Sequence, residues 1–151
     1  MEAAAAQWAM LLILHAAVTW ALVGLILTIQ LVHYPLFSRV GESGWPRYER
    51  EHQARITWLV GPLMFAELLS AALLALRPPT GAPEWSLWLG LILVLAVWIS
   101  TALVQSPLHG RLSERFDARL HRRLVSSNWV RTALWLLRGG LCVWWLWLQV
   151  G

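Results

Sequence analysis

The residues best suited to chemistry are histidines and carboxylates that recur at the ends of long apolar segments. Four of the five histidines lie at such ends, and each of two charged segments contains a carboxylate–histidine pair. Histidine is the commonest neutral metal ligand, and facing helices of a bundle often hold metal ions or haem. The candidate metal ligands are Glu49, His52, Asp117 and His121, and the candidate cofactor-binding residues are His33 and His109.

The spacing of these residues leaves the kind of site open. Glu49-x-x-His52 has the spacing of di-iron carboxylate bundles, but Asp117-x-x-x-His121 is not the second Glu-x-x-His that such a site needs. A metal ion, a haem, an acid/base site and a quinone-headgroup site would all use these residue types. Alternatively, these residues form no ligand site. The interfacial histidines and arginines would then bind lipid headgroups and hydrogen-bond to the free backbone groups at helix ends.

Two charged residues lie deep inside apolar segments. At about 1.5 Å per residue, Glu67 and Arg138 lie about 16 and about 14 Å from the start of their segments, where an ionised group is expensive. Equal depth and opposite charge predict that they pair, either as a structural bridge or in a proton or substrate role. The candidate catalytic residues are therefore Glu67, Arg138 and Arg131, of which Arg131 would balance charge at the site. We expect His15 to hydrogen-bond to a neighbouring helix.

The composition indicates that lipid surrounds most of the chain. Hydrophobic residues make up 58% of the sequence and charged residues 13%, with 12 tryptophans and no lysine. Soluble domains carry about 25% charged residues, so a soluble globular domain is excluded. The long apolar segments predict an all-α, polytopic membrane four-helix bundle in a single domain, residues 1–151. The expected helices are about 8–33, 46–76, 85–105 and 128–150.

The segments between these helices suggest an internal repeat. Pro-Leu-x-Ser-Arg-Val (35–40) and Pro-Leu-x-Gly-Arg-Leu (107–112) each follow an apolar segment, with 72 positions between Pro35 and Pro107. Two parallel-repeat hairpins would explain this, although the motif also arises wherever a spanning helix meets a basic loop. We expect each proline to end its helix, and an amphipathic cytosolic segment to follow the third helix. Ser126 or Ser127 is the expected N-cap of the fourth helix.

The arginines predict the orientation. The first loop holds four, the second only Arg77, and the third six, so loops one and three should face the cytoplasm with both termini outside. The expected location is the bacterial inner membrane, and the expected partners are membrane lipid and a lipophilic small molecule or quinone. Nucleic-acid binding is not expected, because the basic segments lie against the membrane. A homo-oligomer is left open.

Three short motifs carry a resemblance to known membrane proteins: His-Tyr-Pro-Leu-Phe (33–37), Pro-Leu-His-x-Arg-Leu (107–112) and Asn-Trp-Val-Arg-Thr (128–132). With them the whole chain resembles small bacterial four-helix inner-membrane proteins and, more distantly, the anthrone oxygenase-like membrane family. A Pro-rich boundary after helix three and an arginine on helix four recur there, but the usual polar residue after Pro-Leu is here His109. The first helix, from His15 to His33-Tyr34, shows a weaker similarity to haem-binding four-helix protoporphyrinogen oxidases. The spacing of the histidines differs from that of those proteins.

These resemblances imply a small membrane oxidoreductase that acts on a lipophilic or polycyclic compound. We therefore expect a redox cofactor, metal ion or lipophilic redox substrate in the cytosol-proximal half of the bundle. The competing interpretation is a non-enzymatic membrane subunit or small-solute carrier, in which the same polar layer is structural.

Overall fold

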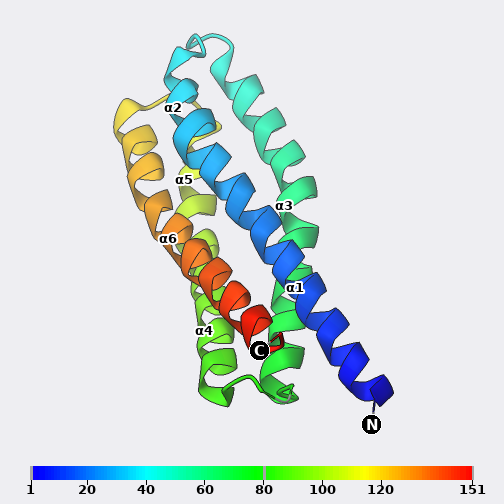
Figure 1. The fold of residues 1–151 in the computed structure, drawn as a ribbon. Helices are drawn as coiled ribbons and strands as arrows, with labels where there is room; N and C mark the ends of the chain where they lie inside the picture. Colours follow the sequence, from blue (N-terminus) through cyan, green and yellow to red (C-terminus); the bar gives the residue numbers. More distant parts are fainter. Residues whose placement is uncertain (1, 80, 151) are drawn as a thin grey trace.

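The chain folds into four long antiparallel helical rods (Figure 1). The computed structural model describes residues 2–79 and 81–150. The first rod contains α1 (Glu2–Thr28), the π-helical η1 (Ile29–His33), α2 (Tyr34–Leu36) and the 3-10 helix η2 (Phe37–Arg39). The second is α3 (Trp45–Leu76). The third contains α4 (Glu84–Ser100), the π-helical η3 (Thr101–Gln105) and α5 (Ser106–Leu112), and the fourth is α6 (Ala118–Leu148).

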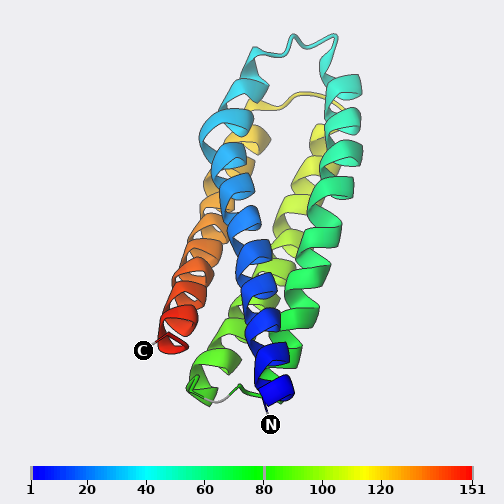
Figure 2. The ribbon, with the colours of Figure 1, turned by 45° about the vertical axis from the view of Figure 1, so that its right-hand side comes forward.

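The rods form a closed bundle. Each long helix packs against its neighbours in the chain, and α1 packs against α6. The connections 40–44 and 113–117 lie at one end of the bundle, which we name the α2/α5 end (Figure 2). The chain termini and the connection between α3 and α4 lie towards the opposite end (Figure 2). The expected all-α four-helix architecture is therefore confirmed.

Three of the helical rods are long and apolar enough to cross a membrane: Ala6–Arg39, Trp45–Leu76 and Glu84–Leu112. Their outer faces carry large apolar side chains, such as Trp58, which is 82% exposed, and Leu103, which is 72% exposed. Several polar side chains, by contrast, are buried between the helices. This distribution is the reverse of that in a soluble bundle, where the outer face is charged.

The expectation that Pro35 and Pro107 end their helices is wrong. Each rod continues past its proline because five residues of π-helix precede it, and the next helical segment begins with the proline near its start. In that position the missing N–H of proline costs little. The two π-helical segments begin at Ile29 and Thr101, which are again 72 positions apart.

The last helix also begins earlier than expected. Asp117, rather than Ser126 or Ser127, is its N-cap, and one carboxylate oxygen accepts the backbone N–H groups of Arg119 and Leu120 at 2.8 and 2.9 Å. The basic segment expected to be a separate amphipathic element is therefore divided between α5, a short connection and the first turns of α6. The helix needs only one good cap, and Asp117 supplies it.

We expect Gly90→Ala to lower the thermal unfolding midpoint. A Cβ at Gly90 would lie 2.7 Å from Cη2 of Trp145, whose Nε1 donates to Ser86 Oγ at 2.9 Å and holds the ring in place. Overpacking costs about 1–3 kcal/mol, which exceeds the gain of about 1 kcal/mol from alanine in a helix. Gly140→Ala is the control, because a Cβ there meets nothing within 4 Å. Thermal melts followed by circular dichroism in detergent should give the highest unfolding midpoint for Gly140→Ala, an intermediate one for wild type and the lowest for Gly90→Ala.

Asp117→Ala should lower the same midpoint at neutral pH by removing the cap. The N–H groups of Leu120 and Arg119 hold the pKa of the Asp117 carboxyl below its ordinary value. The contribution of this carboxylate is therefore complete above the ordinary aspartate pKa and is lost as the pH falls through the lowered one. The difference between wild type and Asp117→Ala should shrink over that acidic range, and a constant difference would contradict the assignment.

Candidate functional site

A polar network lies at the centre of the bundle and connects all four long helices. Arg138 Nε on α6 donates to Glu67 Oε1 on α3 at 2.8 Å, and both side chains are 1% exposed. Glu67 also accepts hydrogen bonds from Thr19 on α1 at 3.1 Å and from Trp135 Nε1 at 3.0 Å. Arg138 Nη1 donates to the Gly90 carbonyl on α4. The expected pairing of Glu67 with Arg138 is confirmed.

His15 completes this network. Its Nε2 accepts from Arg138 Nη2 at 3.0 Å, so the proton of the neutral ring lies on Nδ1, which faces Ser70 Oγ at 2.7 Å. This confirms the expectation that His15 bonds to a neighbouring helix. Because Glu67 and Arg138 satisfy each other and line no described cavity, the geometry favours a structural role over a catalytic one.

A second polar cluster lies near the α2/α5 end and is arranged as a chain of hydrogen bonds. The Glu49 carboxylate is fully buried and faces His109 Nδ1 at 2.5 Å. The other ring nitrogen, Nε2, lies 2.8 Å from the Tyr34 hydroxyl. Gln53 donates to Glu49 Oε1 at 3.3 Å and to the His109 carbonyl at 3.1 Å. Glu49 therefore orients His109, whose other ring nitrogen lies within hydrogen-bonding distance of the Tyr34 hydroxyl.

Two further histidines extend this cluster. His33 Nε2 and His52 Nδ1 are 3.0 Å apart, and the rings of His52 and His109 have centroids 5.7 Å apart. The sequence placed these residues near one membrane boundary but could not show that they meet. The structure brings together three of the four boundary histidines with Glu49.

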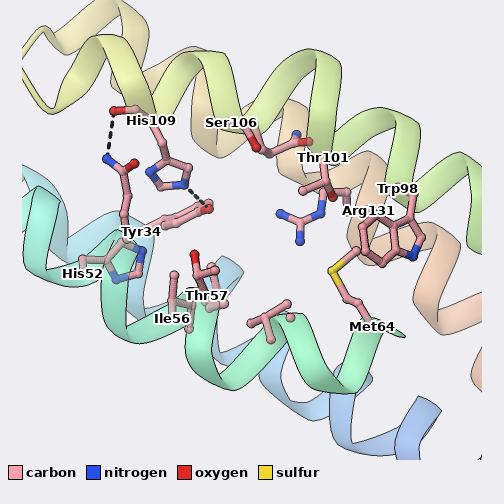
Figure 3. A pocket seen from close by; sticks show the side chains of 15 residues that line it. Tyr34, His52, Ile56, Thr57, Met64, Trp98, Thr101, Ser106, His109 and Arg131 are labelled. Carbon is pink, nitrogen blue, oxygen red and sulfur yellow. Dashed lines mark hydrogen bonds between the residues drawn. The ribbon is translucent and has the colours of Figure 1, made fainter. Parts of the chain in front are cut away.

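A cavity of about 390 Å³ borders this cluster (Figure 3). Its walls come mainly from α3 and from the facing α4–η3–α5 rod, with Tyr34 and Arg131 reaching it from the first and fourth rods (Figure 3). One end is polar, with Tyr34, His52 and His109, and the remainder includes Ile56, Val60, Met64 and Trp98. This combination of an apolar wall and a few converging polar groups is typical of small-molecule sites.

Arg131 reaches into the cavity from α6 (Figure 3). Its side chain is 7% exposed, and Nη1 donates to Asn128 Oδ1 at 3.2 Å. Asn128 Nδ2 in turn donates to Gln30 Oε1 at 2.8 Å, which fixes the amide. The guanidinium lies 5.1 Å from the centroid of the Trp135 ring and within interaction range of the Tyr34 hydroxyl. The structure thus places Arg131 at the cavity, as a charge beside the polar end.

The proposed metal ligands do not form one site. Asp117 caps α6, and His121 Nε2 donates to the Tyr34 carbonyl at 2.8 Å. Glu49 and His52 belong to the cluster described above and have other hydrogen-bond partners. No group of three or more histidine, cysteine, aspartate or glutamate side chains within residues 2–79 and 81–150 is arranged to hold a metal ion.

The residues expected to bind a cofactor have other contacts. Both ring nitrogens of His109 are engaged, with Glu49 and Tyr34, and His33 Nε2 lies against His52 Nδ1. An axial ligand needs a free imidazole nitrogen directed at the iron. His109 therefore has no nitrogen available for a haem in this arrangement, and binding of a haem by His33 stays a prediction.

Sequence reasoning missed Tyr34 as a site residue. The available signal was its position between His33 and Pro35, in the first of the two related motifs. The π-helical turn that precedes it could not be read from that motif, and its contact with His109 joins residues 75 positions apart. Gln53 and Trp98 were missed for the same reason, because neither carries a sequence pattern of its own.

Fold and site together define an all-helical bundle with three helices of membrane-spanning length and a hydrogen-bonded polar cluster beside a cavity. Comparison with known proteins finds no matching family model and no match among the curated proteins or the solved structures.

We expect Glu67→Ala to destabilise the bundle strongly, because it leaves Arg138 buried without its counter-charge. Breaking one side of a buried pair costs about 3–5 kcal/mol. Glu51→Ala is the matched control, since Glu51 forms an exposed pair with Arg47 on the same helix and such pairs contribute little. The difference in stability between the two variants can be measured as the fraction of each protein that stays monodisperse after heating in detergent. Equal behaviour of the two variants would show that the central pair does not hold the helices together.

Proposed function

We propose that this chain is an integral protein of the bacterial cytoplasmic membrane, with four spanning helices and both termini outside. Three rods of spanning length and their apolar outer faces support this placement. The pairing of Arg138 with Glu67 removes one obstacle to a membrane position for α6. The concentration of arginine in the first and third connections supports the orientation. The matched prolines and π-helical segments support two parallel-repeat hairpins.

Within that bundle, the cavity binds a lipophilic compound and Tyr34 exchanges a proton with it. The observation that carries this function is the hydrogen-bonded series from Glu49 through His109 to the Tyr34 hydroxyl. A carboxylate, an imidazole and a hydroxyl in this order form a general acid–base unit, because the carboxylate stabilises the imidazolium that forms. The low-polarity surroundings strengthen these interactions.

The proton has a defined route in either direction. When the compound loses a proton, Tyr34 relays it to His109 Nε2, and the imidazolium is stabilised by Glu49. When the compound gains a proton, His109 returns one to the Tyr34 oxygen as the hydroxyl proton leaves. Arg131, beside Tyr34, stabilises negative charge on the oxygen during the transfer.

This chemistry suits the proton-transfer part of an oxidoreductase reaction. A quinone takes up two protons on reduction to a quinol and releases them on oxidation, so its headgroup needs a nearby acid–base group. A small membrane oxidoreductase is therefore the enzyme class that we propose, with the site supplying the protons and a separate redox partner supplying or accepting the electrons. The competing class, a carrier or non-enzymatic subunit, would bind the compound without a linked proton.

Calorimetric titration with menadiol, a lipophilic naphthoquinol, tests this function. Titrations at one pH in two buffers of different ionisation enthalpy report the protons exchanged on binding. Wild type should exchange a measurable fraction of a proton, up to about one per ligand. Tyr34→Phe and His109→Gln should retain binding and lose most of that exchange.

Tyr48→Phe is the control, because Tyr48 lines another cavity and does not contact His109. Equal heats in both buffers for wild type would indicate binding without proton transfer and favour the carrier. Absence of menadiol and menadione binding to wild type would contradict a quinone-type ligand for the cavity.

A further inference from the structure

Two arginines on α6 occupy comparable positions but have different partners. Arg131 and Arg138 are separated by seven residues, about two helical turns, so both face the bundle interior. Arg138 pairs with the carboxylate of Glu67. Among the described residues, no ion pair involves Arg131. A guanidinium cannot lose its charge in a protein, so Arg131 keeps a charge inside the bundle without a direct counter-charge among the described residues.

The hydrogen bonds of Arg131 leave part of its guanidinium without a partner among the described residues. Nη1 donates to Asn128, the guanidinium lies within hydrogen-bonding range of the Tyr34 hydroxyl, and Nε is a buried donor with no partner in the described part of the chain. The side chain also lines the cavity. A guanidinium matches the two oxygens of a carboxylate, which it binds through two parallel hydrogen bonds.

The rest of the cavity indicates what the carboxylate is attached to. Beyond the polar end, the wall includes Ile56, Val60, Met64 and Trp98. These side chains offer few hydrogen bonds and favour a hydrocarbon chain or ring. The cavity lies between two rods with strongly apolar outer faces, so its ligand would approach from the lipid.

We infer that the ligand of this cavity is a lipophilic carboxylate, whose carboxylate is held by the guanidinium of Arg131 and whose apolar part lies along Met64 and Trp98. This inference rests on the proposed function of the cavity and specifies its ligand class. Arg131 is then the anchor, and Tyr34 acts on the part of the ligand next to the carboxylate.

Decanoic acid labelled with carbon-13 at the carboxyl group, and decan-1-ol as its uncharged counterpart, are suitable probes. Native mass spectrometry of detergent-solubilised protein should show one bound decanoate and markedly less decanol. Carbon-13 spectra should show the bound carboxyl group in its ionised form, with a shift distinct from that of decanoate in empty micelles.

Arg131→Gln should weaken decanoate binding roughly 10- to 100-fold, as expected for the loss of charge-assisted hydrogen bonds. Arg131→Lys keeps the charge without the two-pronged edge and should give an intermediate loss. Arg123→Gln, on the exposed face of the same helix, should bind like wild type. If Arg131→Gln does not fold, Arg131→Lys provides the comparison.

The outcomes separate this inference from the proposed function. Equal affinity of wild type and both Arg131 variants for decanoate would overturn the inference. A phospholipid that stays bound at this site and is not displaced by decanoate would also overturn the inference. Its phosphate would then be the counter-ion of Arg131. If menadiol binds with a linked proton and decanoate does not bind, the function stands and the ligand class is wrong. If neither probe binds, the cavity function itself fails.

Discussion

The ion pair between Glu67 and Arg138 is the constraint on which the rest of the bundle depends. A buried charge is tolerated only when it is paired and its remaining hydrogen-bonding groups are satisfied. Here the partners come from every long helix: Thr19 and His15 from α1, Glu67 from α3, the Gly90 carbonyl from α4, and Arg138 from α6. Apolar surfaces alone would permit sliding of one helix along another. The directional network fixes the register of all four.

That register decides what happens closer to the α2/α5 end. With Arg138 fixed, Arg131 lies two turns away on the same face of α6 and faces the cavity. The two polar layers then differ in one respect. The central layer, the network around Glu67 and Arg138, is closed in the sense that the two charges pair with each other. The layer near the α2/α5 end is open, because among the described residues Arg131 forms no ion pair and Glu49 Oε2 has no hydrogen-bond partner.

The π-helical segments are the backbone feature that builds the open layer. Each inserts one residue into a turn directly before Tyr34 or Ser106, and both of these residues line the cavity. Such segments are rare and often occur at functional sites, because the extra residue redirects side chains and weakens the local hydrogen-bond ladder. Both precede a proline, whose lack of an N–H is tolerated at the start of the following segment.

The sequence by itself determined the all-helical architecture and the presence of helices long and apolar enough to cross a membrane. Both follow from the length of apolar segments, which is a local property. The pairing of Glu67 with Arg138 was predicted from the cost of a buried charge, and the structure confirmed the contact. Tertiary structure alone decided that His109 contacts Tyr34 and Glu49, and that Arg131 faces a cavity. Those facts depend on helix rotation and on π-helical turns, and a rotation of half a turn would exchange the inner and outer faces without changing the composition.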